Sequence, residues 1–293
     1  MVHLSKEDIL EDTRHPFMDD SSKYYSWRGH NIHYKDEGNG TPIVLLHGTS
    51  SSLDTWDQLV INLKHHYRVI RPDLIGFGLT GPHNASNYSL EAYQQFIFDF
   101  TQFLGLDSFF IGGNSWGGLL CWNFASSHQK NLLGLILINS AGFKLHKVPK
   151  RFVLSQFGLG RWLLKNLSFK WFVKEGLKEV FHSKALICTN TINRYHKLLL
   201  RQGNRKAFLE FIRQRDRVDT SILSRIKIPT LILWGSEDKL YPLYQGFIFK
   251  RKIKNSYLKI IEKSGHIPME ESPTPCYIEI NRFITNLKQK KNV

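Results

Sequence analysis

The chain has 293 residues, of which 42% are hydrophobic and 13% aromatic, and its formal net charge is +15. This length and apolar content allow one large domain with a substantial buried core, and they exclude an intrinsically disordered chain. No apolar run approaches the roughly 18–20 residues that a transmembrane helix needs, and the polar stretch at residues 1–20 is unlike a secretory signal peptide.

Along most of the chain, apolar runs of strand length alternate with stretches of helical periodicity. A first pair of strands is expected over residues 23–35, with a turn at Gly29. Further strands are predicted at 43–47, 67–71, 108–112, 133–139, 228–234 and 257–261, and helices at 55–64, 89–104, 119–128, 242–252 and 274–288. Such alternation is typical of an α/β fold whose mostly parallel sheet is covered by helices on both faces.

The alternation stops between about Phe143 and Arg217, where amphipathic helical segments replace the strands. This segment contains 18 Lys and Arg residues against four Asp and Glu, whereas the rest of the chain contains 22 against 21. The sequence therefore predicts two parts of one core, at residues 1–142 and 218–293, separated by a basic helical insertion at 143–217.

The most specific motif is Gly113-x-Ser115-x-Gly117, which follows an apolar run and precedes a predicted helix. This context is typical of a nucleophile elbow, in which a serine occupies a tight strand-to-helix turn and small neighbours let the backbone close. The turn exposes the serine hydroxyl and leaves the amide of Trp116 at a helix N-terminus, where it can stabilise an oxyanion.

Two downstream loops carry the partners that a nucleophilic serine needs. Asp238 follows the predicted strand at 228–234, and His266 follows the strand at 257–261. Both residues therefore lie beyond the C-terminal ends of strands, where open α/β sheets build their sites. His266 is the candidate general base and Asp238 its orienting carboxylate, with neighbouring Glu237 as the rival. Upstream, Thr49 follows the strand at 43–47 and is the candidate second oxyanion donor.

In these motifs and their order, the chain resembles the α/β-hydrolase superfamily over roughly residues 22–288, in particular its esterase-like, cap-bearing branch. Further matching segments are residues 34–38, 71–78 and 265–273. The resemblance implies a Ser115/His266/Asp238 triad, an oxyanion hole formed by the amides of Thr49 and Trp116, and a helical cap over the site. The resemblance does not identify a substrate. From the roles of these residues we expect cleavage of small-molecule or lipid esters through an acyl-enzyme, without a metal or organic cofactor.

Two alternatives to ester hydrolysis remain open. Carbon–carbon bond hydrolases that act on ring-fission products use the same triad, although they typically carry Trp after the catalytic histidine, where this chain has Ile267. Haloalkane dehalogenases and epoxide hydrolases place aspartate at the elbow, so Ser115 argues against both. A non-catalytic protein that binds a membrane or a partner through the basic cap is the alternative of a different class.

The charge of the insertion has three interpretations: a solvated helix surface, contact with an anionic membrane surface, or attraction of an acidic substrate. No nucleic-acid-reading motif accompanies it, so nucleic acid is not an expected partner. The three cysteines, Cys121, Cys188 and Cys276, lie far apart without metal-ligand spacing, which favours a reduced compartment. We therefore expect a cytoplasmic protein that contacts membranes, if at all, only at their surface.

Overall fold

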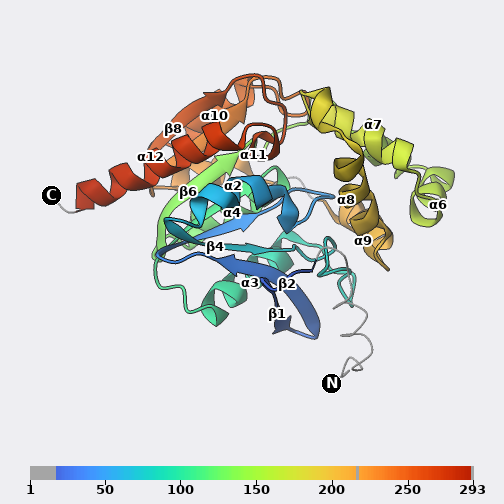
Figure 1. The fold of residues 1–293 in the computed structure, drawn as a ribbon, viewed down its shortest axis with the longest axis horizontal. Helices are drawn as coiled ribbons and strands as arrows, with labels where there is room; N and C mark the ends of the chain where they lie inside the picture. The colour runs from blue at the N-terminus through green and yellow to red at the C-terminus, as the bar shows by residue number, and fades with distance from the viewer. Residues whose placement is uncertain (1–17, 216–217, 292–293) are drawn as a thin grey trace.

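The computed structural model describes residues 18–215 and 218–291, built around one eight-stranded sheet (Figure 1). The strand order is β1-β2-β4-β3-β5-β6-β7-β8. The strands are β1 (Ser22–Trp27), β2 (His30–Glu37), β3 (Thr41–Leu46), β4 (Tyr67–Pro72), β5 (Phe109–Asn114), β6 (Leu132–Ile138), β7 (Thr230–Gly235) and β8 (Ser256–Ile261). All neighbours from β4 to β8 pair in parallel, whereas β2 is antiparallel to both β1 and β4. The predicted mostly parallel α/β sheet is confirmed.

A two-residue turn joins β1 to β2 at the position expected from Gly29. Arg28 and Gly29 both have positive φ, at 48° and 82°. Two consecutive residues of this kind make a hairpin turn whose twist matches that of the flanking strands.

Of the other sequence predictions, the polar stretch at residues 1–17 and the insertion boundary at residue 217 lie outside the described residues.

Helices cover both faces of the sheet (Figure 1). One face packs against α2 (Asp57–Leu63) and α12 (Pro273–Lys291), and the other against α3 (Leu90–Phe103), α4 (Trp116–Ser127) and α10 (Tyr244–Lys252). The short elements η1 (Leu53–Trp56), η3 (Thr220–Arg225) and α11 (Pro268–Glu271) complete this core. Among the described residues, no helix combines the length and apolarity needed to span a bilayer.

Successive side chains along each central strand contribute alternately to the apolar clusters on the two faces of the sheet. In β3, Ile43 and Leu45 belong to the cluster that contains α2 and α12. The intervening Val44 and the following Leu46 belong to the cluster that contains α3 and α4. All four side chains are at most 1% exposed. Because successive side chains of a strand point to opposite faces, a strand with both faces covered is apolar throughout, as this one is.

The chain between β6 and β7 forms helices, as predicted, and we call these helices the inserted segment. They are α5 (Lys150–Leu154), α6 (Gly158–Asn166), α7 (Lys170–Val180), η2 (Lys184–Leu186), α8 (Thr189–Leu200) and α9 (Asn204–Gln214). Figure 1 shows α6 and α7 at the outer edge of the molecule, away from the sheet. Through Phe208 and Phe211, α9 joins the core cluster that contains α4. The boundaries of the three-part division at 142 and 218 stay a prediction.

The turn from β5 into α4 is possible only because two glycines allow the backbone of α4 to lie in direct contact with the ends of β5 and β3. A Cβ added to Gly113 would lie 2.4 Å from the carbonyl carbon of Gly117. A Cβ added to Gly117 would lie 2.1 Å from the carbonyl oxygen of Leu46 in β3. Real Cβ atoms do not approach backbone atoms this closely, so any larger residue would force the helix away from the sheet.

Gly117→Ala is therefore expected to lower the free energy of unfolding by about 3 kcal/mol or more, because the clash is with backbone that cannot rotate away. The measurement is urea denaturation followed by circular dichroism. Gly158→Ala is the matched control: a Cβ there meets nothing within 4 Å, so stability should change by no more than about 0.5 kcal/mol. Equal effects of the two substitutions would contradict this account of the turn.

Candidate active site

Ser115 lies at the sharp turn between β5 and α4, in a backbone conformation that non-glycine residues rarely adopt. Its φ is 54° and its ψ is −116°. Such a conformation costs roughly 1–3 kcal/mol, and it persists only where the surroundings hold it. Here the Ser115 amide donates to the carbonyl of Ile138 (3.2 Å), and the Ser115 carbonyl accepts from the amides of Leu119 (3.0 Å) and Ala141 (2.9 Å). The predicted elbow geometry is therefore present.

The structure brings His266 and Asp238 together from loops that are 28 residues apart in the chain. His266 Nδ1 lies 2.8 Å from Asp238 Oδ2. A carboxylate oxygen accepts, so Nδ1 carries the proton and Nε2 is left as the basic nitrogen. The other oxygen, Oδ1, accepts from the amides of Leu240 (2.8 Å) and Tyr241 (3.0 Å). The rival carboxylate, Glu237, is exposed, so Asp238 is the residue that can orient the histidine.

A further residue that orients Asp238 was missed by the sequence analysis. The Asn139 side chain donates from Nδ2 to Asp238 Oδ2 at 2.7 Å, while its Oδ1 accepts from the amide of Gly235 at 3.0 Å. Asn139 is fully buried and has a positive φ of 42°. Asparagine tolerates that conformation better than most residues. In the sequence, only the position of Asn139 directly after a predicted buried strand pointed to a role in the site, and no spacing rule connects it to Asp238.

Asn114, immediately before the elbow serine, holds the histidine loop against the sheet. Its Nδ2 donates to the carbonyl oxygens of His266 (2.9 Å) and Ile138 (3.1 Å). The residue is buried. One amide group therefore fixes the main chain of His266 relative to the strand end that presents Ser115. The sequence motif singled out the serine and gave no sign of this neighbour's role.

The loop after β3 packs directly against the elbow. A Cβ added to Gly48 would lie 3.1 Å from the Cβ of Ser115. Thr49 follows Gly48, and both line the same cavity as Ser115. Trp116 is the first residue of α4, so its amide has no partner within the helix. The two amides predicted as oxyanion donors thus belong to the two segments that meet at Ser115.

His47 supports this loop from below. Its Nδ1 lies 2.8 Å from the carbonyl oxygen of Gly48, and its Nε2 lies 2.9 Å from the amide nitrogen of Leu74. The carbonyl can only accept and the amide can only donate, so the imidazole is held in one neutral tautomer. Complete burial lowers the pKa of His47, in keeping with the neutral form. His47 therefore has no free nitrogen with which to act as a second base.

Ser115 and His266 open onto one large cavity of about 790 Å³ between the core and the inserted segment. Its core side includes Thr49, Asn114, Tyr241 and Ile267. Its other side is formed by residues of α5, α6, α7, α8 and α9, and most of them are apolar, such as Phe152, Leu164, Phe172, Leu177 and Phe208. A volume of this size accommodates a drug-sized molecule or a long acyl chain.

Three arginines also line this apolar cavity: Arg151, Arg205 and Arg215. The guanidinium of Arg215 lies 5.8 Å from the ring centroid of Trp116 and donates to the hydroxyl of Tyr241 at 3.0 Å. Arg151 has no hydrogen-bond partner for its buried Nε. Burial lowers the pKa of Arg151, but an arginine so far above neutrality stays cationic. Lys150 also lines the cavity, and Glu175 and Glu179 oppose these four cations, so the lining carries a net positive charge.

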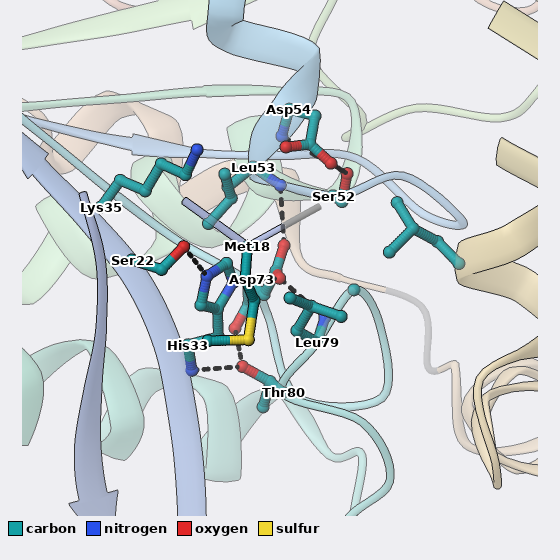
Figure 2. Close-up of polar contacts among 12 residues, drawn as sticks. Met18, Ser22, His33, Lys35, Ser52, Leu53, Asp54, Asp73, Leu79 and Thr80 are labelled. Carbon is teal, nitrogen blue, oxygen red and sulfur yellow. Dashed lines mark hydrogen bonds and ion pairs between the residues drawn. The ribbon is translucent and has the colours of Figure 1, made fainter. Parts of the chain in front are cut away.

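A second Ser–His–Asp array occurs at the sheet edge, away from this cavity. Figure 2 shows His33 between Ser22 and Asp73, with Nε2 3.1 Å from the serine hydroxyl and Nδ1 2.8 Å from the carboxylate. Asp73 also accepts from the amides of Leu53 (2.7 Å) and Leu79 (2.8 Å). Burial alone would raise the pKa of Asp73, but the hydrogen bond and charge of His33 lower it. The cavity lining includes neither Ser22 nor His33, so this network fastens loops to β2.

The loop that carries His266 is attached to the inserted segment through Glu271. The Glu271 carboxylate accepts from the amide of Gly265 (2.7 Å), in the histidine loop. It also accepts from the amides of His182 (2.8 Å) and Ser183 (2.9 Å), at the end of α7. The amide of His266 itself donates to the carbonyl oxygen of Val180 at 2.8 Å. The inserted segment therefore bears directly on the position of the histidine.

A second link joins α8 to the core through Glu270. Its carboxylate accepts from the hydroxyls of Thr55 (2.5 Å) and Tyr195 (2.6 Å), and it pairs with Arg194. Tyr195 lines the cavity, and burial followed by the charge of Glu270 raises its pKa. Two adjacent glutamates that follow His266 in the chain thus hold two different helices of the inserted segment.

Within residues 18–215 and 218–291, no group of three or more His, Cys, Asp or Glu side chains is arranged to hold a metal ion. The polar groups around Ser115 are instead committed to one another. Asp238 has four donors, from Asn139, His266 and two backbone amides. The site thus contains a serine hydroxyl, an imidazole whose Nε2 is free of the carboxylate, and a carboxylate that orients that imidazole.

Comparison with known proteins supports the predicted fold. A family model for the alpha/beta hydrolase fold matches residues 41–166. Lipase 1 of Psychrobacter immobilis is 26% identical over 83% of this chain and 77% of the relative. The 2-hydroxy-6-oxo-6-(2'-aminophenyl)hexa-2,4-dienoic acid hydrolase of Metapseudomonas resinovorans is 25% identical over 91% of each chain. The crystal structure of a putative lipase from Acinetobacter baumannii AYE aligns with a TM-score of 0.79 at 22% identity, covering 99% of both chains. The expected fold is confirmed.

The attachment through Glu271 generates a stability prediction. Glu271→Ala leaves the amides of Gly265, His182 and Ser183 without their acceptor, so the free energy of unfolding should fall by about 2–3 kcal/mol. Thermal and urea denaturation provide the measurement. Glu262→Ala, an exposed glutamate just before the same loop, is the control and should be neutral within about 0.5 kcal/mol. A neutral Glu271→Ala would show that this carboxylate does not hold the two segments together.

Proposed function

We propose that this chain, which has the alpha/beta hydrolase fold, is a serine hydrolase that cleaves carboxylic esters with Ser115, His266 and Asp238. The observation that carries the proposal is the 2.8 Å contact between His266 Nδ1 and Asp238 Oδ2, beside a cavity that both Ser115 and His266 line. This contact selects the histidine tautomer whose free nitrogen is basic, as a serine nucleophile requires.

In the proposed mechanism, His266 Nε2 takes the proton of the Ser115 hydroxyl as its oxygen attacks the ester carbonyl. The oxyanion that forms accepts hydrogen bonds from the amides of Thr49 and Trp116. The imidazolium, stabilised by Asp238, then protonates the leaving alcohol, and the C–O bond breaks to leave an acyl-enzyme. Water deprotonated by the same imidazole hydrolyses this intermediate and restores Ser115.

We propose that the inserted segment acts as the cap of this site. Its apolar side chains form most of one wall of the 790 Å³ cavity, and burial there keeps water away from the reacting ester. A cavity of this size and apolar lining favours esters with medium or long acyl chains over acetate esters. Turnover of p-nitrophenyl esters of graded chain length should therefore rise with chain length before it falls.

The deciding experiment is labelling with a fluorophosphonate probe, compared between the wild-type protein and Ser115→Ala. The wild type should be labelled and should hydrolyse the p-nitrophenyl esters. Ser115→Ala should lose labelling and essentially all triad-dependent turnover, because no nucleophile remains. Its circular dichroism spectrum should match that of the wild type. Ester turnover that survives in Ser115→Ala would refute the assignment of the nucleophile.

The same comparison separates the other classes of function. Labelling without turnover of any ester would favour an enzyme that is selective for a different type of bond, such as a carbon–carbon bond. Absence of labelling in a folded protein would favour the non-catalytic interpretation, in which the basic inserted segment binds a membrane or partner.

Carbon–carbon bond hydrolysis of an acidic ring-fission product is the second candidate, and the arginines in the cavity favour it. Arg151, Arg205 and Arg215 line the pocket, and the relative from Metapseudomonas resinovorans is named for a dienoic acid substrate. A guanidinium in an apolar cavity suits a carboxylate. Spectrophotometric turnover of a 2-hydroxy-6-oxo-dienoate that exceeds turnover of every p-nitrophenyl ester would favour this candidate.

Asn139 generates a further prediction as a positioning residue. Asn139→Ala removes one donor to the Asp238 carboxylate, so the histidine is less well oriented and kcat should fall roughly 10- to 100-fold, the kinetic equivalent of one hydrogen bond to a charged group. KM should change little, since Asn139 does not line the cavity. Asn255→Ala is the control, because its exposed side chain donates to the carbonyl of Lys227 far from the site. A fall in Tm with kcat unchanged would mean that Asn139 serves only the fold.

A further inference from the structure

Large apolar side chains are exposed on the outer part of the inserted segment, where soluble domains usually expose few. Trp162 in α6 is 55% exposed and Trp171 in α7 is 64% exposed. We call the whole set the outer apolar patch: Val153, Phe157, Leu159, Trp162, Leu163, Leu167, Phe169 and Trp171. Within α6, Leu159, Trp162 and Leu163 have the i, i+3, i+4 spacing that puts them on one helix face.

Basic residues lie among these apolar ones. Arg161 and Lys165 in α6, and Lys170 and Lys174 in α7, are exposed. Over the whole stretch 143–217, Lys and Arg outnumber Asp and Glu by 18 to four. Aromatic and aliphatic side chains interleaved with cations on neighbouring helices suit the interface of an anionic bilayer, where the apolar groups enter the acyl boundary and the cations meet headgroups.

The outer apolar patch is continuous with the wall of the catalytic cavity. Val153, Leu163, Leu167, Phe169 and Trp171 are exposed, and all five also line the 790 Å³ cavity. The same side chains therefore face both the solvent and the interior. A lipid that left a membrane touching this patch would reach Ser115 and His266 through this mostly apolar cavity.

We propose that the outer apolar patch is a docking surface for anionic phospholipid bilayers, which brings the cavity to its substrate in the membrane. The positive charge selects this partner over a second copy of the chain, because pairing two such surfaces would bring like charges together. The docking itself is independent of catalysis. Its consequence, that the substrate is an ester of a membrane lipid, rests on the proposed function.

Vesicle co-sedimentation of the full chain carrying Ser115→Ala tests the docking without any hydrolysis. The vesicles contain either phosphatidylcholine alone or phosphatidylcholine mixed with phosphatidylglycerol. The protein should sediment with the mixed vesicles and stay in solution with the neutral ones. High salt should weaken the binding, because it screens the charge attraction. Failure to bind the anionic vesicles would overturn the proposal.

Two matched pairs of variants locate the surface. Lys165→Glu/Lys170→Glu/Lys174→Glu should bind anionic vesicles at least about tenfold more weakly, since each lysine near such a surface contributes on the order of 1 kcal/mol. Lys250→Glu/Arg251→Glu/Lys254→Glu, on exposed positions in and after α10, makes the same change of charge and should bind nearly as well as the parent. Equal losses in both would mean attraction by net charge alone and would overturn the assignment to this patch.

For the apolar part, Phe157→Ser/Leu159→Ser/Trp162→Ser should also lose vesicle binding. Tyr244→Ser/Phe247→Ser/Tyr257→Ser, at comparably exposed positions outside the inserted segment, should not. Phe157, Leu159 and Trp162 do not line the cavity. In the catalytically intact protein, the first variant should therefore keep its turnover of a water-soluble ester and lose its turnover of the same acyl ester embedded in anionic vesicles.

These measurements separate failure of the docking from failure of the proposed function. Binding without hydrolysis of any ester would refute the function and leave the docking surface standing. Hydrolysis of soluble esters without vesicle binding would refute the docking alone. A dimer in size-exclusion chromatography that the Phe157→Ser/Leu159→Ser/Trp162→Ser variant dissociates, without vesicle binding, would make the patch an interface between copies and would also overturn the proposal.

Discussion

The close contact between α4 and the end of β3 is the constraint on which the site depends. Gly117 allows the first turn of α4 to lie against the carbonyl of Leu46, and Gly113 allows the chain to reverse direction just before it. This contact holds Ser115 at a positive φ, and the surrounding backbone hydrogen bonds offset the strain. The same contact brings the amide of Trp116 close to the loop at Thr49, because Trp116 directly precedes Gly117 and Thr49 follows shortly after Leu46 in the chain.

The other half of the site is attached to this turn by buried side-chain amides. Asn114 connects the strand end before Ser115 to the main chain of His266, and Asn139 connects the end of β6 to Asp238. Each amide replaces a hydrogen bond that water would otherwise have to supply in a buried place. The sheet order puts β5, β6 and β7 next to one another, which is why residues far apart in sequence can share these short contacts.

The inserted segment has two physical faces with different partners. Its inner side closes the cavity and is tied to the histidine loop by Glu271 and to η1 by Glu270. Its outer side exposes Trp162 and Trp171 amid lysines and arginines. Burial raises the pKa of Glu271, while backbone donors oppose that shift. Because Glu271 joins this segment to the histidine loop, movement of the segment on a membrane surface would act on the position of His266.

The sequence by itself determined the alternation of strands and helices, the elbow at Ser115 and the order in which Asp238 and His266 follow it. Those features are local: side-chain period, glycine spacing and strand ends can be read within a few residues. Only the tertiary structure decided that Asp238 rather than Glu237 meets His266 and that Asn139 and Asn114 hold them. It also decided that apolar and basic residues of α6 and α7 are exposed on the outer side of the inserted segment. Such contacts join residues up to 152 positions apart, and they depend on how helices pack on the sheet, which no local pattern encodes.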